Sequence, residues 1–233
     1  MTEIEIIALL SALIPAVVLL GYIYWQDRKS PEPVQQLLKA TALGVLAIPL
    51  VLAITTPLES LGILTFDVNT VWDAINVSFL GAAIPEELSK LFILWLFLRK
   101  NPHFDERIDG IVYAVCVSLG FAGLENVAYV LGDADWMTTA LSRAFTAVPG
   151  HFCFAVIMGY FYSLAKYEPA HRTRYMAMAI VAPILAHGIY DTLAFLIPLS
   201  AVVEGFLTLL FAVFCFVLWK LASRSIQKHI ANG

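Results

Sequence analysis

Residues 108–131 read IDGIVYAVCVSLGFAGLENVAYVL, and this stretch decides the fold class. Its residues are almost all apolar or small, and a helix of about 20 such residues spans the hydrocarbon core of a membrane. Two polar residues, Glu125 and Asn126, nevertheless lie well inside it. The stretch therefore predicts a membrane-spanning helix that carries a carboxylate at a depth where lipid alone would not tolerate one.

The whole chain has the composition of a membrane protein. Hydrophobic residues make up 60% of its 233 residues and charged residues 14%, whereas soluble domains have roughly 45–50% and about 25%. Only helices satisfy their own backbone hydrogen bonds in long apolar stretches, so we predict an all-α, polytopic transmembrane bundle of about seven spans. The seven stretches lie near residues 4–24, 34–55, 76–98, 108–131, 143–165, 175–197 and 200–220.

The basic residues predict the orientation of this bundle. Lysines and arginines concentrate in the segments after the first, third, fifth and seventh stretches, whereas the alternate segments carry mainly Asp and Glu, with Arg143 as the one basic exception. Basic residues favour the cytoplasmic side, so we expect the N-terminus outside and the C-terminus inside. His103, His171 and His229 fall in the predicted cytoplasmic segments and are expected to be solvated.

The organisation of the chain limits where its chemistry can lie. Loops are short, and neither a linker nor an internal repeat divides the chain, so residues 1–233 are expected to form a single transmembrane domain with a motif-bearing core at 76–197. The formal charge of −4 is small and no basic patch with interleaved aromatics occurs, so we expect contact with the lipid bilayer and no nucleic-acid partner. Any chemistry must come from side chains inside the bundle.

Ionisable residues recur inside four of the predicted spans. Each costs at least about 2.5–3.5 kcal/mol at the centre of a membrane, so each is a functional-site candidate. Glu86, Glu125, His151, His187 and Asp191 lie 13–18 residues from the nearest predicted cytoplasmic Lys or Arg. This spacing is roughly 20–27 Å along a helix, which places them in one layer in the outer half of the membrane. The candidates are Glu86, Glu87, Lys90, Glu125, Asn126, His151, His187 and Asp191.

Spacing places some of these side chains on a common helix face. Lys90 follows Glu86 by four residues and Glu87 by three, so either carboxylate can pair with its ammonium group. His187 and Asp191 are also four residues apart, so the carboxylate can orient the imidazole or act on a substrate directly. A purely structural ion pair explains one carboxylate beside Lys90 but leaves a surplus acid.

Four short strings in this region resemble the signature of the PrsW family of intramembrane proteases. They are IPEELSK at 84–90, GFAGLEN at 120–126, PGH at 149–151 and HGIYD at 187–191, in this order on consecutive predicted helices. The resemblance implies a multi-pass peptidase of the bacterial cytoplasmic (inner) membrane, distantly similar to the CAAX prenyl proteases. It also implies a single-pass membrane protein as substrate, such as the anti-sigma factor cleaved by the founding member. The distant relatives carry histidine where this chain has Glu125.

Peptide hydrolysis gives these residues defined roles. The reaction needs an activated water, a group that accepts and returns its proton, and a positive group that stabilises the tetrahedral oxyanion. A buried glutamate suits the proton transfer, and we assign it to Glu86 with Glu87 as its partner. The predicted catalytic residues are Glu86, Glu87, His151, His187 and Asp191, with Lys90, Glu125 and Asn126 in support.

A metal ion is one source of the activated water. Glu125, His151 and His187 form the two-histidine, one-carboxylate set typical of catalytic Zn²⁺, with a fourth position open. Their spacing is not HExxH, so the metal is inferred from residue types alone. A metal-free mechanism stays open, in which a glutamate–histidine base acts while His187 and Asp191 hold the oxyanion or the scissile bond.

Two other functions compete with proteolysis. A proton- or ion-coupled transporter also uses intramembrane Glu, His and Asp, but a transport path would leave polar residues at several depths, and no inverted repeat is evident. A non-catalytic assembly or sensor protein is the third possibility. If the chain is a protease, the outer layer of polar residues predicts cleavage near the extracytoplasmic end of the substrate's span. No oligomeric state is predicted.

Overall fold

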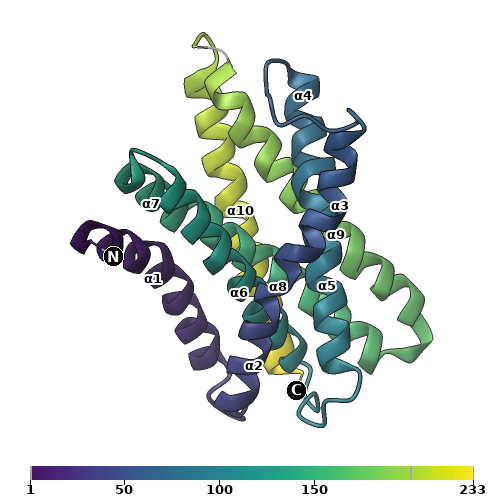
Figure 1. Ribbon diagram of the computed structural model, residues 1–233. Coiled ribbons are helices and arrows are strands. Elements are labelled where there is room, and N and C mark those ends of the chain that lie inside the picture. The colour runs from purple at the N-terminus through teal and green to yellow at the C-terminus, as the bar shows by residue number, and fades with distance from the viewer. Residues whose placement is uncertain (1, 200, 233) are drawn as a thin grey trace.

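A computed structural model of the chain describes residues 2–199 and 201–232 (Figure 1). These residues form helices, with no strand among them, which confirms the all-α prediction. The α-helices are α1 (Glu3–Gln26), α2 (Val34–Val45), α3 (Ala47–Ser60), α4 (Val71–Asn76), α5 (Ile84–Leu98), α6 (Asp109–Gly132), α7 (Trp136–Phe145), α8 (Ala147–Tyr167), α9 (Arg172–Leu196) and α10 (Glu204–Ala231). A π-helix, η1 (Val77–Ala83), and two short 3-10 helices, η2 (Pro169–His171) and η3 (Ile197–Leu199), complete the set.

Six helical segments of the described residues are long and apolar enough to cross a membrane. They correspond to six of the seven expected stretches, although Ser200, where the last stretch was expected to begin, lies outside the described residues. The remaining stretch, 76–98, is part of a helical run over 71–98 made of α4, η1 and α5. Every 18-residue window of this run holds at least three of Asp73, Glu86, Glu87 and Lys90, so the run is too highly charged to be counted among the six. The orientation of the bundle stays a prediction.

Helices α6 and α8 lie at the centre of the bundle (Figure 1). Helix α6 contacts α1, α2 and α8, and α8 also contacts α9 and α10. Glycines allow this close approach: a Cβ atom on Gly120 would lie 2.0 Å from the Thr41 carbonyl oxygen, and one on Gly159 would lie 2.3 Å from that of Gly110. Close packing of small residues is a main source of association between membrane helices. It fixes α6, which carries Glu125, against its neighbours.

The distribution of polar and apolar residues suits a lipid environment. Large apolar side chains such as Val17 on α1 and Phe206, Leu209 and Phe216 on α10 are exposed. Carboxylates, imidazoles and Lys90 are buried between the helices instead. Ionisable residues of membrane helices face the bundle interior because contact with lipid is costly for them.

The helical run that carries the paired glutamates changes pitch just before them. The π-helix η1 ends at Ala83, and Pro85 lies in the first turn of α5. Proline has no backbone N–H to donate to the preceding turn, so the regular hydrogen-bond pattern is interrupted here. Short π-helical segments are frequent at functional sites, and this one directly precedes Glu86 and Glu87.

One histidine that was expected to be solvated is buried. His229 is 1% exposed, its ring stacks on that of Tyr160 with centroids 4.4 Å apart, and its Nε2 lies 3.1 Å from the Tyr160 carbonyl oxygen. The prediction was wrong because α10 continues to Ala231, past the expected end near residue 220, and packs against α8.

Candidate active site

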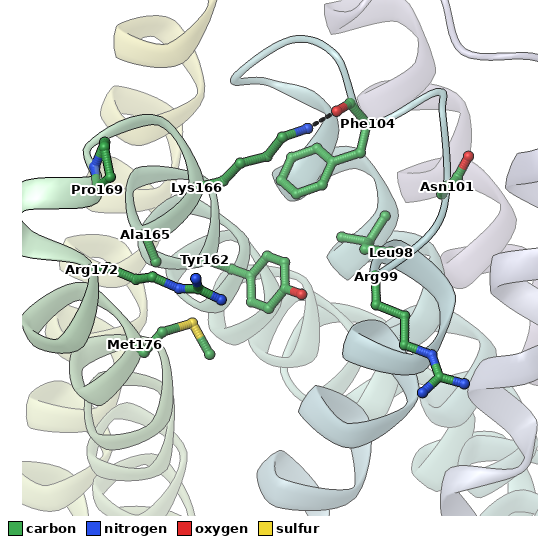
Figure 2. A pocket seen from close by; sticks show the side chains of 10 residues that line it. All are labelled: Leu98, Arg99, Asn101, Phe104, Tyr162, Ala165, Lys166, Pro169, Arg172 and Met176. Atoms are coloured by element: carbon green, nitrogen blue, oxygen red, sulfur yellow. Dashed lines mark hydrogen bonds between the residues drawn. The ribbon is translucent and has the colours of Figure 1, made fainter.

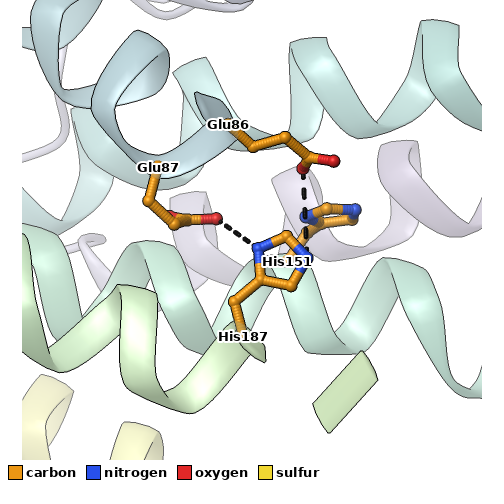
Figure 3. A group of neighbouring side chains, drawn as sticks. All are labelled: Glu86, Glu87, His151 and His187. Atoms are coloured by element: carbon orange, nitrogen blue, oxygen red, sulfur yellow. Dashed lines mark hydrogen bonds and ion pairs between the residues drawn. The ribbon is translucent and has the colours of Figure 1, made fainter. Parts of the chain in front are cut away.

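Predicted site residues from three helices meet in one buried group. Glu86 and Glu87 come from α5, His151 from α8 and His187 from α9, and each is at most 6% exposed. Each offers one oxygen or nitrogen atom, and these atoms all lie within 4.8 Å of one another. Figure 3 shows the two carboxylates facing the imidazole groups. The convergence expected from the shared helical depth is therefore confirmed for these residues.

Lys90 lies in contact with three members of this group. Its Nζ is 3.1 Å from Glu86 Oε2, 2.8 Å from Glu87 Oε1 and 3.2 Å from His151 Nδ1. Both ion pairs that the spacing allowed are thus formed. An ammonium group only donates hydrogen bonds, so Nδ1 of His151 accepts and the ring proton of the neutral imidazole lies on Nε2.

His187 has a carboxylate beside each ring nitrogen. Its Nδ1 lies 2.8 Å from Glu87 Oε1, whereas its Nε2 lies 3.2 Å from Asp191 Oδ2 and 4.0 Å from Glu86 Oε2. The predicted pairing with Asp191 is confirmed. If Nδ1 donates its proton to Glu87, Nε2 faces two acceptor groups and needs a proton or a cation between itself and them.

Glu125 and Asn126, on α6, contact Arg143 of α7, and Asn126 also contacts α1. Glu125 Oε2 lies 3.1 Å from His151 Nε2 and 2.7 Å from Arg143 Nη2. Arg143 Nε donates to Asn126 Oδ1 at 2.6 Å, and Asn126 Nδ2 donates to the Ala12 carbonyl oxygen at 2.7 Å. Arg143 was not predicted as a site residue. Its signal in the sequence was its place as the only basic residue among the predicted extracytoplasmic segments.

A cavity of about 320 Å³ opens onto the buried group. Glu86, His151 and His187 line it, together with Glu125, Arg143 and Asp191. Among the described residues, neither Glu87 nor Lys90 belongs to its wall. Glu86 is therefore the member of the glutamate pair that a water or a substrate in the cavity can reach.

A larger cavity, of about 370 Å³, lies toward the opposite ends of the same helices (Figure 2). Basic side chains, Arg99, Lys166 and Arg172, contribute to its wall, and Lys166 donates to the Phe104 carbonyl oxygen. No carboxylate, imidazole or thiol of the described residues lines it. We therefore assign the candidate active site to the smaller cavity, because the groups needed for hydrolysis are there.

Comparisons with known proteins identify the family. Residues 32–219 match the family described as PrsW family intramembrane metalloprotease. Protease PrsW of Clostridioides difficile (strain 630) is 32% identical over 229 residues, which cover 96% of this chain and 92% of that protein. Protease PrsW of Bacillus subtilis (strain 168) is 37% identical over 186 residues, which cover 79% and 81%. The chain belongs to the PrsW family. No solved structure gives a significant match.

Membership of the PrsW family makes the chain an intramembrane metalloprotease. The family assignment favours peptide hydrolysis over ion transport as the function of the chain. The family name also implies a metal ion, and the donor set fits one, because carboxylate oxygen and imidazole nitrogen are the usual protein ligands of catalytic zinc. When bound, such an ion polarises a carbonyl group and makes water more acidic.

The net negative charge of this PrsW-family site also favours a bound cation. The site holds four carboxylates but only two Lys or Arg side chains, so two negative charges are not balanced by these cations. The carboxylates are those of Glu86, Glu87, Glu125 and Asp191, and the cations are Lys90 and Arg143. In addition, Glu87 Oε2 is buried and has no hydrogen-bond partner among the described residues. A divalent cation, or protons on both imidazoles, would balance this excess. Glu86, Glu87, His151 and His187 are the residues that would hold a metal ion.

This ligand set differs from the sequence prediction in its carboxylates. His151 and His187 belong to it as expected, but Glu125 lies outside the group, and Glu86 and Glu87 belong to it. The reason is the contact between Glu125 and Arg143, which uses the carboxylate as an ion-pair partner at 2.7 Å. Glu125 also faces Nε2 of His151, so its contact with the group is through that imidazole.

Proposed function

We propose that this protease cleaves single-pass membrane proteins near the extracytoplasmic end of their span, in the bacterial cytoplasmic membrane, with Zn²⁺ as its metal. The observation that carries the proposal is the cavity onto which Glu86, His151 and His187 open. Phe66, from the α3–α4 connection, also lines this cavity, and the basic residues predict that connection on the extracytoplasmic side. The substrate's scissile bond would therefore reach the site from the outer half of the membrane.

We assign proton transfer to Glu86. Its carboxylate lines the cavity, so it can accept a proton from the attacking water and return it to the amine that leaves the cleaved peptide bond. Lys90, 3.1 Å away, keeps this carboxylate oriented and compensates its charge. Glu87 lies outside the cavity wall and contacts His187 Nδ1, so we assign it to fixing the orientation of that imidazole.

The two histidines are held by carboxylates on different helices. Glu87 and Asp191 contact the two ring nitrogens of His187, and Glu125 contacts Nε2 of His151. Such contacts fix the tautomer and ring direction of an imidazole that binds a metal or donates to an oxyanion. Their supporting role agrees with the metal-dependent mechanism.

The shape of the site favours a membrane-anchored substrate over a soluble one. The cavity is enclosed by η1, α5, α6, α7, α8 and α9, and its polar wall lies deep between helices whose outer surfaces are apolar. A regulatory protein anchored by one span, such as an anti-sigma factor, has the chemistry expected of the substrate. Cleavage near its outer boundary would release the extracytoplasmic part and leave the span for a second protease.

Reconstitution in lipid nanodiscs with tagged single-pass proteins tests the proposal. Wild type should cut an accepted substrate in the outer half of its span, and Glu86→Gln should slow this cleavage by about 10²–10⁴-fold, as expected for loss of a general base. Glu59→Gln, which changes an exposed glutamate near the end of α3, is the matched control and should cut at the wild-type rate. Products that map by mass spectrometry to the cytoplasmic boundary would contradict the proposed geometry.

A further inference from the structure

A second acidic group lies far from the active site, where the α1–α2 connection meets the α5–α6 connection. It consists of Glu32, Asp105 and Asp109, whose nearest oxygens all lie within 4.8 Å of one another. Asp109 begins α6, the helix that carries Glu125. These two residues are 16 positions apart, which is about 24 Å along the helix. The second acidic group is therefore separate from the hydrolytic site.

Neutral donors hold the acids of this region in place. Asp109 Oδ2 accepts hydrogen bonds from the backbone N–H groups of Asp105, at 2.9 Å, and Glu106, at 2.5 Å. The Tyr113 hydroxyl donates to Glu32 Oε2, and the Glu32 backbone N–H donates to Asp27 Oδ2 at 3.1 Å. These bonds fix the carboxylates without supplying a positive charge.

Glu32 and Asp109 of this group are buried without an ion-pair partner among the described Lys and Arg residues. Glu32 is 5% exposed and Asp109 is 1% exposed, and the neighbouring Asp27 is 3% exposed. In the described part of the chain, none of these three forms an ion pair with Lys or Arg within 4.0 Å. Asp109 Oδ1 has no hydrogen-bond partner there either. Burial accordingly raises the pKa of Asp27 to about 7, because the charged carboxylate is poorly solvated.

We propose that Glu32, Asp105 and Asp109 bind a hard divalent cation, Mg²⁺ or Ca²⁺. All the ligands are carboxylate oxygens, which these ions prefer, and no imidazole or thiol of the described residues belongs to the group. Asp109 Oδ1 is buried and accepts no hydrogen bond from the described residues, and the side chain of Asp105 is exposed to solvent.

The oxygen spacing is compatible with either ion. Ligand oxygens on opposite sides of Ca²⁺ are about 4.6–5.2 Å apart, whereas those around Mg²⁺ are about 4.0–4.2 Å apart. The oxygens of the three residues all lie within 4.8 Å of one another, so they are close enough to contact one ion together. With either ion, the site would tie the α1–α2 connection to the first turn of α6.

Thermal unfolding of the full-length protein in detergent tests this proposal. After treatment with chelator and dialysis, MgCl₂ or CaCl₂ is added at constant ionic strength. We expect a saturable rise in Tm of about 2–4 °C, because the cation binds the folded state. The ion that saturates at the lower concentration identifies the preferred ligand.

Variants show whether the response comes from the second acidic group. Asp105→Asn changes an exposed side chain and so keeps the fold, and it should weaken the apparent affinity by about tenfold or more, as should Asp109→Asn. Glu106→Gln removes a neighbouring charge outside the group, and Glu86→Gln changes the active site; both should keep the wild-type midpoint.

Three results would overturn the proposal. One is a wild-type Tm that does not respond to either cation. Another is an Asp105→Asn variant that responds at the wild-type midpoint. The third is a response that Glu86→Gln abolishes, because the cation would then bind at the active site.

Discussion

Lys90 Nζ lies 3.2 Å from Nδ1 of His151, and it lies 2.8 and 3.1 Å from carboxylate oxygens of Glu87 and Glu86. One ammonium group thus contacts three of the four side chains that would hold the metal. The protein therefore carries a built-in counter-ion at the candidate metal site. A metal ion among these side chains would compete with that ammonium group for the same oxygens.

Removing this counter-ion should strongly destabilise the protein. In Lys90→Met, two buried carboxylates lose their cation, and we expect the free energy of unfolding to fall by about 3–5 kcal/mol, as when one partner of a buried ion pair is removed. Lys90→Arg should lose less, because it keeps the charge. Unfolding by denaturing detergent, followed by tryptophan fluorescence, measures both. Added Zn²⁺ should stabilise Lys90→Met more than wild type, and equal stabilisation would argue against a competition between metal and ammonium.

Arg143 is expected to act through Glu125 and Asn126. Arg143→Met leaves both side chains without this partner, so we expect a loss of about 1–3 kcal/mol in stability and a lower cleavage rate. A double-mutant cycle with Glu125→Gln checks the mechanism. The two substitutions should couple by about 0.5–3 kcal/mol if the ion pair matters. Strict additivity would show that Arg143 acts elsewhere.

The contact between α2 and α6 should tolerate no added methyl group. In Gly120→Ala the new Cβ would lie 2.0 Å from a backbone oxygen of Thr41, so the helices must separate. We expect a loss of about 1–3 kcal/mol in stability, and a lower cleavage rate because α6 carries Glu125. Gly21→Ala is the matched control on α1, because nothing lies within 4 Å of its new Cβ. It should be neutral or slightly stabilising, and a similar loss in both variants would contradict the packing argument.

Much of the fold and the composition of the site could be predicted from the sequence, because length and hydropathy fix membrane helices and helical rise fixes depth. These two rules are enough to place Glu86, His151 and His187 in one layer of the bundle. The depth of a residue in the membrane does not predict how its helix is rotated. It also does not predict which side chains reach the site from a segment that folds back against the bundle. Arg143 reaches Glu125 because α7 folds back against α6, and Glu86 differs from Glu87 in its contact with His187 and in its place in the cavity wall.

The second acidic group shows the same limit more clearly. Glu32 lies in the α1–α2 connection and Asp109 in the first turn of α6, far apart in the chain, and no hydrophobic period or spacing rule joins them. The pitch change at η1 was also not predicted, although Pro85 marks its position. His229 was misplaced because the extension of α10 beyond its apolar stretch brings a polar residue into a contact with Tyr160.

We propose that Glu86, Glu87, His151 and His187 form one metal-dependent hydrolytic site. The most direct test is the metal content of the purified protein. Elemental mass spectrometry measures it on folded, monodisperse samples. Wild type should hold about one Zn²⁺ ion per chain, as a catalytic zinc site does. Glu87→Gln and His187→Ala should lose it, and Glu125→Gln should keep it. Full metal content in Glu87→Gln and His187→Ala, or loss in Glu125→Gln alone, would contradict the claim.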